Sequence, residues 1–204
     1  MLYETILGEQ FSKLHPEIQR RYTNTFQHTL LFKGVMETIF ISPLLTPVAY
    51  LFRPYRFLLP KSGTNIPFTI KLYTRQQSPE VYDVVWERTF LMDEKEYKFD
   101  SVMQFNLRTR EVVDSLGNPA VVKAPLTFNV SEDGQLLMRG MSGQHLAFLP
   151  FPIPIPALFG AKAFVLEGYD EQQQVHTIHL STYSDSIGNM MRYAGSFTID
   201  VLHE

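Results

Sequence analysis

Apolar residues near the start of the chain recur every three or four positions. They are Tyr3, Ile6, Leu7, Phe11 and Leu14. This spacing puts them on one stripe of an amphipathic helix. His15-Pro16 interrupts the stripe, because the residue before a proline disfavours the helical conformation, whereas proline suits the first position of a new helix. The sequence therefore predicts two helices at the start of the chain, the second beginning at Pro16.

After Thr25 the apolar positions recur with a period of two, which is typical of β-strands with one dry and one wet face. Such runs lie at residues 29–34, 68–73, 82–90, 97–105 and 191–201. In the run 97–105 the pattern puts Asp100 on the wet face. Gly34 is expected to bend the first strand. Turn sequences at residues 117–119 and 132–134 predict β-hairpins.

Two proline-rich segments break the strand pattern. Residues 39–59 are the most hydrophobic window, but Pro43, Pro47 and Pro54 interrupt it together with two arginines, so it does not predict a membrane span. We interpret it as a short, proline-broken helix that buries one face on the core; a membrane-touching segment is the alternative. Residues 148–156 alternate proline with apolar residues, which suits a sheet edge or the rim of a cavity; a proline-recognition ligand is the alternative.

These elements predict a β-rich α+β fold. About nine or ten strands joined mostly by hairpins give a large curved antiparallel sheet. The sheet is expected to be half or fully closed into a barrel, with its mouth capped by the N-terminal helices and the proline-broken segment. No linker or repeat divides the chain, so we expect residues 1–204 to form a single domain.

Composition excludes several function classes. Hydrophobic residues make up 45% of the chain, with 16 Phe and 10 Tyr, so the chain has enough apolar surface to fold. The net charge of −3, without a basic block, argues against nucleic-acid binding. The absence of cysteine removes disulfides, thiolate nucleophiles and thiolate metal sites. The first 20 residues do not match a secretory signal, so we expect a cytoplasmic protein, and we predict no metal and no cofactor.

Trp86, Arg88 and Phe90 share one face of the run 82–90. A buried guanidinium needs a carboxylate, carbonyl groups or an aromatic plane, because its desolvation is otherwise unfavourable. Arg88 is therefore either part of a core ion pair or stacked on Trp86, or it anchors the acidic group of a ligand at the wall of an apolar cavity. Arg139, flanked by apolar residues, is either a solvated strand residue or a second inward cation.

Glu167 is the candidate acidic counterpart on a neighbouring strand. If it faces inward, it is expected to pair with an arginine rather than act as a catalytic base. His176 and His179 have the spacing of a helical metal pair, but the surrounding pattern predicts a strand, which puts them on opposite faces. His176 is expected to face inward as a hydrogen-bonded core residue, and a role as general base is the alternative.

Several short motifs in order along the chain resemble a bacterial domain of unknown function, the 4166 family. They are Leu2-Tyr3, Leu7-Gly8, Phe11, Leu14-His15-Pro16, Trp86-Glu87-Arg88-Thr89-Phe90, Met138-Arg139-Gly140, the proline-rich stretch 152–156, Glu167 and Tyr193-Ala194-Gly195. The resemblance covers nearly the whole chain and brings no catalytic residues with it. The family is often joined to an NAD(P)-binding dehydrogenase-like module, which implies action beside an oxidoreductase. This chain has no dinucleotide fingerprint of its own.

We therefore expect non-enzymatic binding of an apolar or lipid-like, possibly acidic, small molecule inside the curved sheet. The candidate ligand-binding residues are Trp86, Arg88, Phe90, Arg139, Glu167, His176 and Tyr193. An accessory or interaction domain that works with a dehydrogenase-like protein is the alternative function. A self-contained enzyme would require His176 within hydrogen-bond reach of Glu167 or a tyrosine at a solvent-reachable pocket.

Overall fold

Ten strands form a closed antiparallel barrel in the computed structural model, which describes residues 2–147, 151–156, 158 and 160–202. The barrel strands, in order of pairing, are β7 (Val122–Val130), β6 (Glu111–Leu116), β5 (Ser101–Asn106), β3 (Val81–Met92), β2 (Gly63–Ser78), β1 (Thr29–Ile41), β13 (Gly188–Leu202), β12 (Val175–Ser184), β11 (Lys162–Asp170) and β8 (Leu136–Gly140). The pairing of β8 with β7 closes the ring. The predicted β-rich α+β class is confirmed, and the choice between a half and a full barrel is settled in favour of closure.

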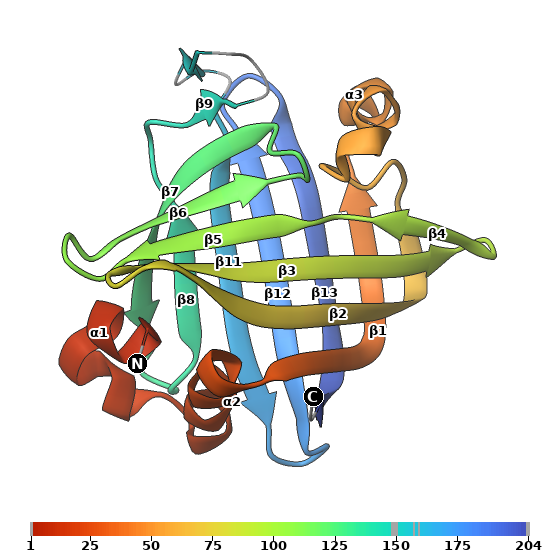
Figure 1. Ribbon diagram of the computed structural model, residues 1–204. Helices are drawn as coiled ribbons and strands as arrows, with labels where there is room; N and C mark the ends of the chain where they lie inside the picture. The colour runs from red at the N-terminus through yellow and green to blue at the C-terminus, as the bar shows by residue number, and fades with distance from the viewer. Residues whose placement is uncertain (1, 148–150, 157, 159, 203–204) are drawn as a thin grey trace.

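Three short strands extend the sheet beyond this ring. They are β4 (Lys95–Lys98), β9 (His145–Leu146) and β10 (Ile153–Pro154). In Figure 1, β2, β3 and β5 cross in front of β8, β11, β12 and β13, so the two walls of the barrel run at a steep angle to each other. Side chains from both walls point into the space between them.

The helices cover different ends of the barrel. They are α1 (Leu2–Leu7), η1 (Gly8–Lys13), α2 (Pro16–Gln27), η2 (Pro43–Leu45), α3 (Thr46–Leu51) and η3 (Arg53–Tyr55). Figure 1 shows α1 and α2 at the bottom, which we call the helix-capped end, and α3 at the top, near the opposite end. We call that opposite end the rim end; it contains the β6–β7 turn and residues 141–147, 151–156 and 160–161. The two predicted N-terminal helices are confirmed, but the expectation that they share one mouth with the proline-broken segment is wrong.

The proline-broken segment is shorter than the sequence predicts, because Ile39 and Ile41 still pair with β13 as part of β1. Beyond them, each proline begins a new short helical turn near its N-terminus, where its missing N–H group is not needed. Leu45 and Ala49 are buried as expected, whereas Leu44 and Leu51 are exposed. The helices thus bury one face but leave large apolar side chains in solvent.

Strand β1 curves sharply as it passes from one wall to the other (Figure 1). A Cβ atom on Gly34 would lie 2.1 Å from the carbonyl oxygen of Ser196, and one on Gly195 would lie 2.4 Å from that of Val35. Both glycines therefore permit a close approach of the β1 and β13 backbones that any other residue would obstruct. A register shift between Met36 and Thr38 adds a bulge at this corner.

The predicted run 97–105 is two strands rather than one, and Asp100 interrupts it. Its carboxylate accepts a hydrogen bond from the backbone N–H of Arg88 at 3.2 Å and one from the Arg56 guanidinium at 3.0 Å. Its own N–H donates to the carbonyl of Arg56. The expectation that Asp100 lies on the wet face is wrong, because these bonds hold it in a buried position.

The proline-rich segment lies at a sheet edge, as its composition predicts. Ile153 and Pro154 pair with β9, and Ile155 lines a cavity described below. Phe148 and Pro150, which belong to the same predicted segment, lie outside the described residues. Prolines suit this edge because they donate no hydrogen bond to a further strand.

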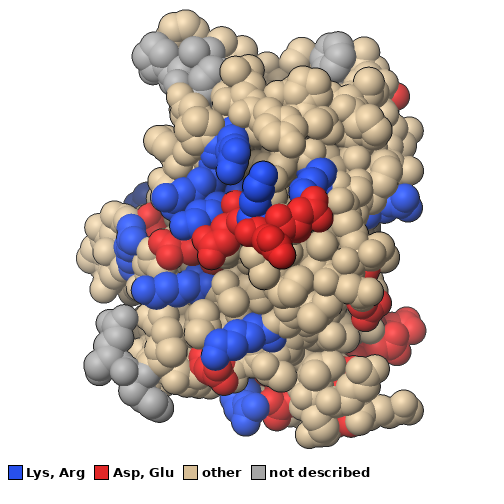
Figure 2. Space-filling model, turned by 90° about the vertical axis from the view of Figure 1, so that its right-hand side faces the viewer, with Lys and Arg blue, Asp and Glu red and all other residues tan. Residues whose placement is uncertain are grey.

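The surface carries charges of both signs. In Figure 2, Lys and Arg side chains lie next to Asp and Glu in a band across one face, and the surface above this band is mostly uncharged. In the described part of the chain, no helix combines the length and the apolar character that crossing a membrane requires.

Candidate functional site

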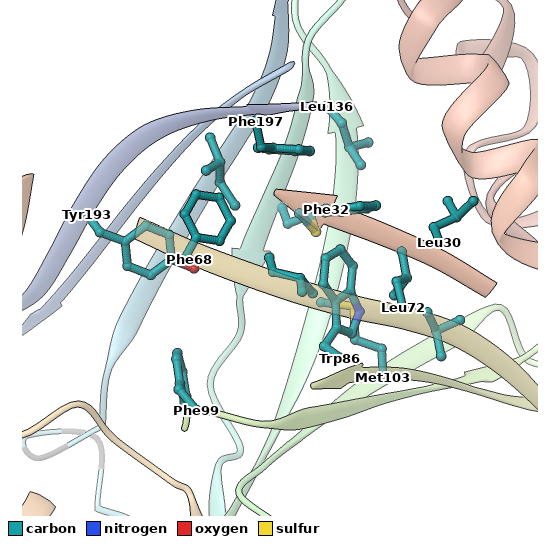
Figure 3. Packing of buried hydrophobic residues seen from close by; sticks show 14 of the residues in the cluster. Leu30, Phe32, Phe68, Leu72, Trp86, Phe99, Met103, Leu136, Tyr193 and Phe197 are labelled. Carbon is teal, nitrogen blue, oxygen red and sulfur yellow. The ribbon is translucent and has the colours of Figure 1, made fainter. Parts of the chain in front are cut away.

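Aromatic rings fill the helix-capped half of the barrel interior. The ring of Tyr3 from α1 lies 3.9 Å from that of Tyr22 in α2, between centroids, and 5.0 Å from that of Phe105 in β5. Phe32 from β1 stacks on Phe197 from β13 at 4.9 Å, and Figure 3 shows both rings inside the barrel. The helices thus supply a plug that leaves little room for a ligand in this half.

A buried ion pair lies at the centre of this plug. The Arg21 guanidinium contacts the Glu167 carboxylate, and both side chains are almost completely buried. The Tyr22 hydroxyl donates to the same carboxylate oxygen, Oε2. Burial is the largest influence on the pKa of Arg21 and lowers it, but the charge of Glu167 together with Tyr22 and Tyr3 raises this pKa above its ordinary value. The expectation that an inward Glu167 pairs with an arginine is confirmed, and its partner is Arg21, a residue that the sequence analysis did not consider.

His176 lies beside this cluster and faces inward, whereas His179 is exposed, as the strand pattern predicts. The ring of His176 stacks on that of Phe197, with 5.4 Å between the two ring centroids. Burial, reinforced by the positive charge of Arg21, lowers the pKa of His176 to about 3. The imidazole is therefore neutral at physiological pH. Among the described residues its Nδ1 has no hydrogen-bond partner, so the expected hydrogen-bonded core histidine is not what the structure shows.

The rim half of the interior is hollow. It holds a cavity of about 190 Å³ with an almost entirely apolar wall. The lining residues are Phe57, Phe99, Met103, Asp114, Leu116, Val122, Ala124, Leu126, Met138, Gly140, Gln144, Ile155, Ala161, Ala163, Val165, Leu180, Thr182, Met190 and Met191. Alternate residues of β6, β7, β11 and β12 contribute, because side chains on one strand point inward at every second position. Phe57 and Ile155 belong to loops at the rim end.

Asp114 of β6 is the single ionisable side chain of this lining, and it is 9% exposed. Burial raises its pKa to about 6, while nearby Arg88 and the hydroxyl of Ser101 act in the opposite direction. Its Oδ1 atom has no hydrogen-bond partner among the described residues. The cavity wall therefore contains one carboxylate within an otherwise apolar surface, and one oxygen of this carboxylate is fully buried and unpaired.

The two other strongly polar side chains of the lining are already used by the backbone. The Gln144 amide accepts a hydrogen bond from the N–H of Ala161 at 2.9 Å and donates to the carbonyl of the same residue. The Thr182 hydroxyl accepts from the N–H of Met191 at 2.9 Å and donates to its carbonyl at 3.2 Å. These contacts hold the rim loop and the β12–β13 ladder, so Asp114 is left as the free polar group.

Arg88 lies behind the cavity wall. Its guanidinium donates to the carbonyl of Phe99 at 3.3 Å and to Ser101 Oγ at 3.2 Å. It also lies 5.0 Å from the ring centroid of Trp86 and 5.2 Å from that of Phe99. The stacking on Trp86 that the sequence offered as one interpretation is thus present. Trp86 and Phe90 are buried in the core beside it, and Figure 3 shows Trp86 among the packed rings.

The other candidate residues are spread over the molecule. Arg139 lies on the outer surface, with its guanidinium 4.7 Å from the ring centroid of Phe164. Tyr193 is buried inside the barrel, where burial raises the pKa of its hydroxyl. Glu167 and His176 belong to the helix-capped half. None of the seven sequence-predicted residues is among the described side chains that line the cavity.

Sequence reasoning missed Asp114, although a signal was present. Val112, Asp114 and Leu116 share one face of β6 and are paired across the sheet with inward residues of β5. A carboxylate between two apolar residues on the dry face of a strand is unusual, because burial without a partner disfavours its charge.

The condition for a self-contained enzyme is not met at His176. The Glu167 carboxylate accepts from Arg21 and Tyr22, and the unpaired Nδ1 of His176 lacks an orienting group within the described residues. A search of the same residues shows no cluster of three or more His, Asp or Glu side chains that could hold a metal ion. The arrangement can bind, exclude water and present one carboxylate, but it offers no nucleophile with an adjacent base.

Fold and cavity together define the class: a closed antiparallel β-barrel with a small apolar chamber at one end. A model of the family described as domain of unknown function DUF4166 matches residues 14–197, so the chain belongs to this family. The chain is also similar to the uncharacterized protein YndH of Bacillus subtilis (strain 168), with 29% identity over 188 residues that cover 90% of each chain. The family that the sequence motifs suggested is therefore confirmed.

Proposed function

We propose that this protein binds a small apolar molecule in the cavity at the rim end of its barrel, without catalysing a reaction on it. The observation that carries the proposal is an almost wholly apolar chamber of about 190 Å³. Apolar cavities of about 150 Å³ stay dry and admit benzene, so this chamber suits one ring with a short chain, or an aliphatic chain of similar volume. Four methionines in or beside the wall would adapt to varied ligand shapes.

Access to the cavity is expected through the rim loops. The β9 and β10 strands have two residues each and share only a short ladder, and Gln144 links this region to Ala161. Segments with few backbone hydrogen bonds open at a lower free energy than the long barrel strands. Opening here would admit a ligand while the helix-capped half stays packed.

The experiment that tests this proposal fills part of the cavity with a larger side chain. Ala124 of β7 lines it, and Ala124→Leu adds three carbon atoms to the wall. We expect this variant to lower the affinity for ethylbenzene, measured by calorimetry, at least tenfold. Ala194→Leu makes the same change on β13, where Ala194 borders an open groove on the outer surface, and should leave affinity unchanged. Equal affinities in both variants, with both folded, would remove the cavity as the binding site.

The natural ligand is a separate question. Native mass spectrometry and solvent extraction of protein purified from its own host would identify the class of a co-purifying molecule. The proposal places this binding in the cytoplasm, and cell fractionation would test that location.

A second candidate function is an interaction module for an NAD(P)-dependent oxidoreductase, as the family resemblance implies. The observation that favours it is the exposed apolar surface of η2 and α3, where Leu44 is 69% and Leu51 72% exposed. Co-purification of such an enzyme with the wild type, and its loss with Leu44→Glu combined with Leu51→Glu, would support this function. Ala124→Leu should retain the enzyme, because it changes the interior only.

A further inference from the structure

The cavity wall contains a binding group that its apolar lining does not explain. Asp114 belongs to a strand face that is otherwise apolar, and its Oδ1 atom is buried without a partner. Buried carboxylate oxygens in proteins are nearly always hydrogen-bonded, because desolvation is otherwise uncompensated. Asp114 is also the single ionisable side chain of the described cavity lining, so its carboxylate is the group that a donor on a bound ligand would meet.

The groups around Asp114 do not supply that partner. Arg88 is close enough to act on Asp114 by its charge, but its guanidinium donates hydrogen bonds to the carbonyl of Phe99 and to Ser101 Oγ. The Ser101 hydroxyl interacts with the carboxylate and leaves Oδ1 free. Asp100, between β4 and β5, is itself paired with Arg56. The charge of Asp114 contributes to raising the pKa of Tyr193 and of Tyr3, but neither hydroxyl bonds to Oδ1.

A trapped water molecule would also be poorly held at this position. A buried water molecule typically makes about three hydrogen bonds to protein groups. The lining offers the carboxylate of Asp114, whereas the Gln144 amide and the Thr182 hydroxyl already bond to the backbone. A ligand that brings a donor on an apolar body matches the wall better than water does.

We propose that the ligand of this cavity is an apolar molecule with one hydrogen-bond donor, a hydroxyl or an ammonium group, that bonds to the carboxylate of Asp114. This inference rests on the proposed function and specifies its ligand class. It disfavours a carboxylate ligand, because an ionised acid would meet the carboxylate of Asp114 in the wall. The sequence offered Arg88 as the anchor for an acidic group of the ligand. This proposal instead assigns recognition of the ligand to Asp114, which accepts a hydrogen bond from a donor group.

The two kinds of donor are distinguished by pH. An ammonium group needs ionised Asp114, whose pKa of about 6 leaves it mostly protonated at pH 5. Affinity for an amine should therefore rise roughly tenfold between pH 5 and pH 7.5, as the ionised fraction rises. A neutral alcohol also bonds to the protonated acid, and its affinity should change less than threefold over this range, roughly.

The experiment uses four probes of nearly equal size: ethylbenzene, 2-phenylethanol, 2-phenylethylamine and phenylacetate. Calorimetric titration of the wild type at pH 7.5 should show at least one donor probe binding about tenfold or more tighter than ethylbenzene, and phenylacetate weakest. Asp114→Leu should remove the donor's advantage and leave ethylbenzene bound. Asp114→Asn keeps a carbonyl acceptor and should retain the alcohol while losing the amine's pH dependence.

The outcomes separate this inference from the proposed function. If ethylbenzene binds and neither donor probe binds more tightly, or if the donor's advantage persists in Asp114→Leu, the donor inference is overturned while cavity binding stands. Tightest binding of phenylacetate also overturns it. If none of the four probes binds the wild type, the proposed function fails as well. Circular dichroism confirms that each variant is folded, and Asp114→Asn provides the comparison if Asp114→Leu is not.

Discussion

The two ends of the barrel interior bury different side chains on the same strands. In β7, Phe128 faces the helix-capped half and Ala124 faces the rim half. In β13, Phe197 stacks with other rings near the helices, while Met191 borders the cavity. The cavity wall also contains Gly140, so small inward residues on neighbouring strands leave the space open. Closure of the sheet therefore does not decide whether a barrel is filled; the sizes of its inward residues do.

The charges of the two halves differ in the same way. In the helix-capped half, Glu167 has two donors, Arg21 and Tyr22, from the chain itself. In the rim half, Asp114 keeps an unpaired oxygen beside empty space. A paired buried acid stabilises a particular packing, whereas an unpaired one lowers stability unless a ligand compensates it. The comparison assigns a structural role to Glu167 at the helix-capped end and a binding role to Asp114 at the rim end.

The largest expected effect is on the filled half. Glu167→Ala would leave the Arg21 guanidinium buried without its counter-charge, and we expect it to lower the free energy of unfolding by about 3–5 kcal/mol. Urea denaturation followed by circular dichroism measures this change. Glu171→Ala removes a surface carboxylate that pairs with His15, and the loss should be below about 1 kcal/mol. Similar losses for the two variants would contradict a special role for the buried pair.

Truncating one leucine to alanine in each half tests how differently the two halves are packed. Leu136 of β8 is completely buried near the helix-capped end, and Leu126 of β7 lines the cavity. We expect Leu136→Ala to lower the free energy of unfolding by about 3 kcal/mol, because it opens a new void in packed surroundings. Leu126→Ala should lower it by about 1–2 kcal/mol, because its side chain already borders a void and has fewer contacts to lose. A reversed order in denaturant titrations would show that the hollow half is better packed than its cavity implies.

Local patterns in the sequence predicted much of this fold. The three-and-four spacing predicted the N-terminal helices, and the period of two put His176 and His179 on opposite faces. These features depend on residues close together in the chain. Closure of the barrel depends instead on β8 pairing with both β7 and β11, which local periodicity does not specify.

The site was harder to predict for the same reason. Arg21 and Glu167 are 146 positions apart, and either could have paired with another charge. The strand pattern put Asp100 on the wet face, but Arg56, which is 44 positions away, donates a hydrogen bond to its carboxylate in the folded protein. The cavity results from small residues on different strands meeting in space, and no segment of the sequence carries that information by itself.

A third prediction concerns the lone acid of the hollow half. The folded-state pKa of Asp114 is about 6, above its ordinary value of 3.8, so the folded protein binds more protons than the unfolded chain between these values. The stability contribution of Asp114 therefore falls as pH rises from about 4 to about 6. Asp114→Asn removes this dependence and should be more stable than the wild type by about 2–3 kcal/mol at pH 7, and about equal to it below pH 4. Thermal unfolding of both proteins across this range measures the difference, and a constant gap at every pH would contradict it.

The smallest expected effect has the opposite sign and belongs to the filled half. The folded-state pKa of His176 is about 3, below its ordinary value of 6.5, so here the unfolded chain binds the extra proton. Stability is lost as pH falls below about 6.5, in contrast to the effect of Asp114. Relative to the wild type, the free energy of unfolding of His176→Gln should therefore rise by about 1 kcal/mol when the pH falls from 7.5 to 5. The effect is this small because the ring borders a surface pocket, where solvent screens its charge.

Denaturant titrations of the wild type, Asp114→Asn and His176→Gln at these two pH values compare the ends of the barrel directly. On lowering the pH from 7.5 to 5, Asp114→Asn should lose about half of its advantage over the wild type while His176→Gln gains one. Shifts in the same direction for both variants would mean that the two buried groups do not have the opposite environments that the structure gives them. Opposite shifts would tie the proton uptake at each end to a named side chain, and binding of a donor probe at pH 7 should then reduce the advantage of Asp114→Asn, because it compensates the same carboxylate.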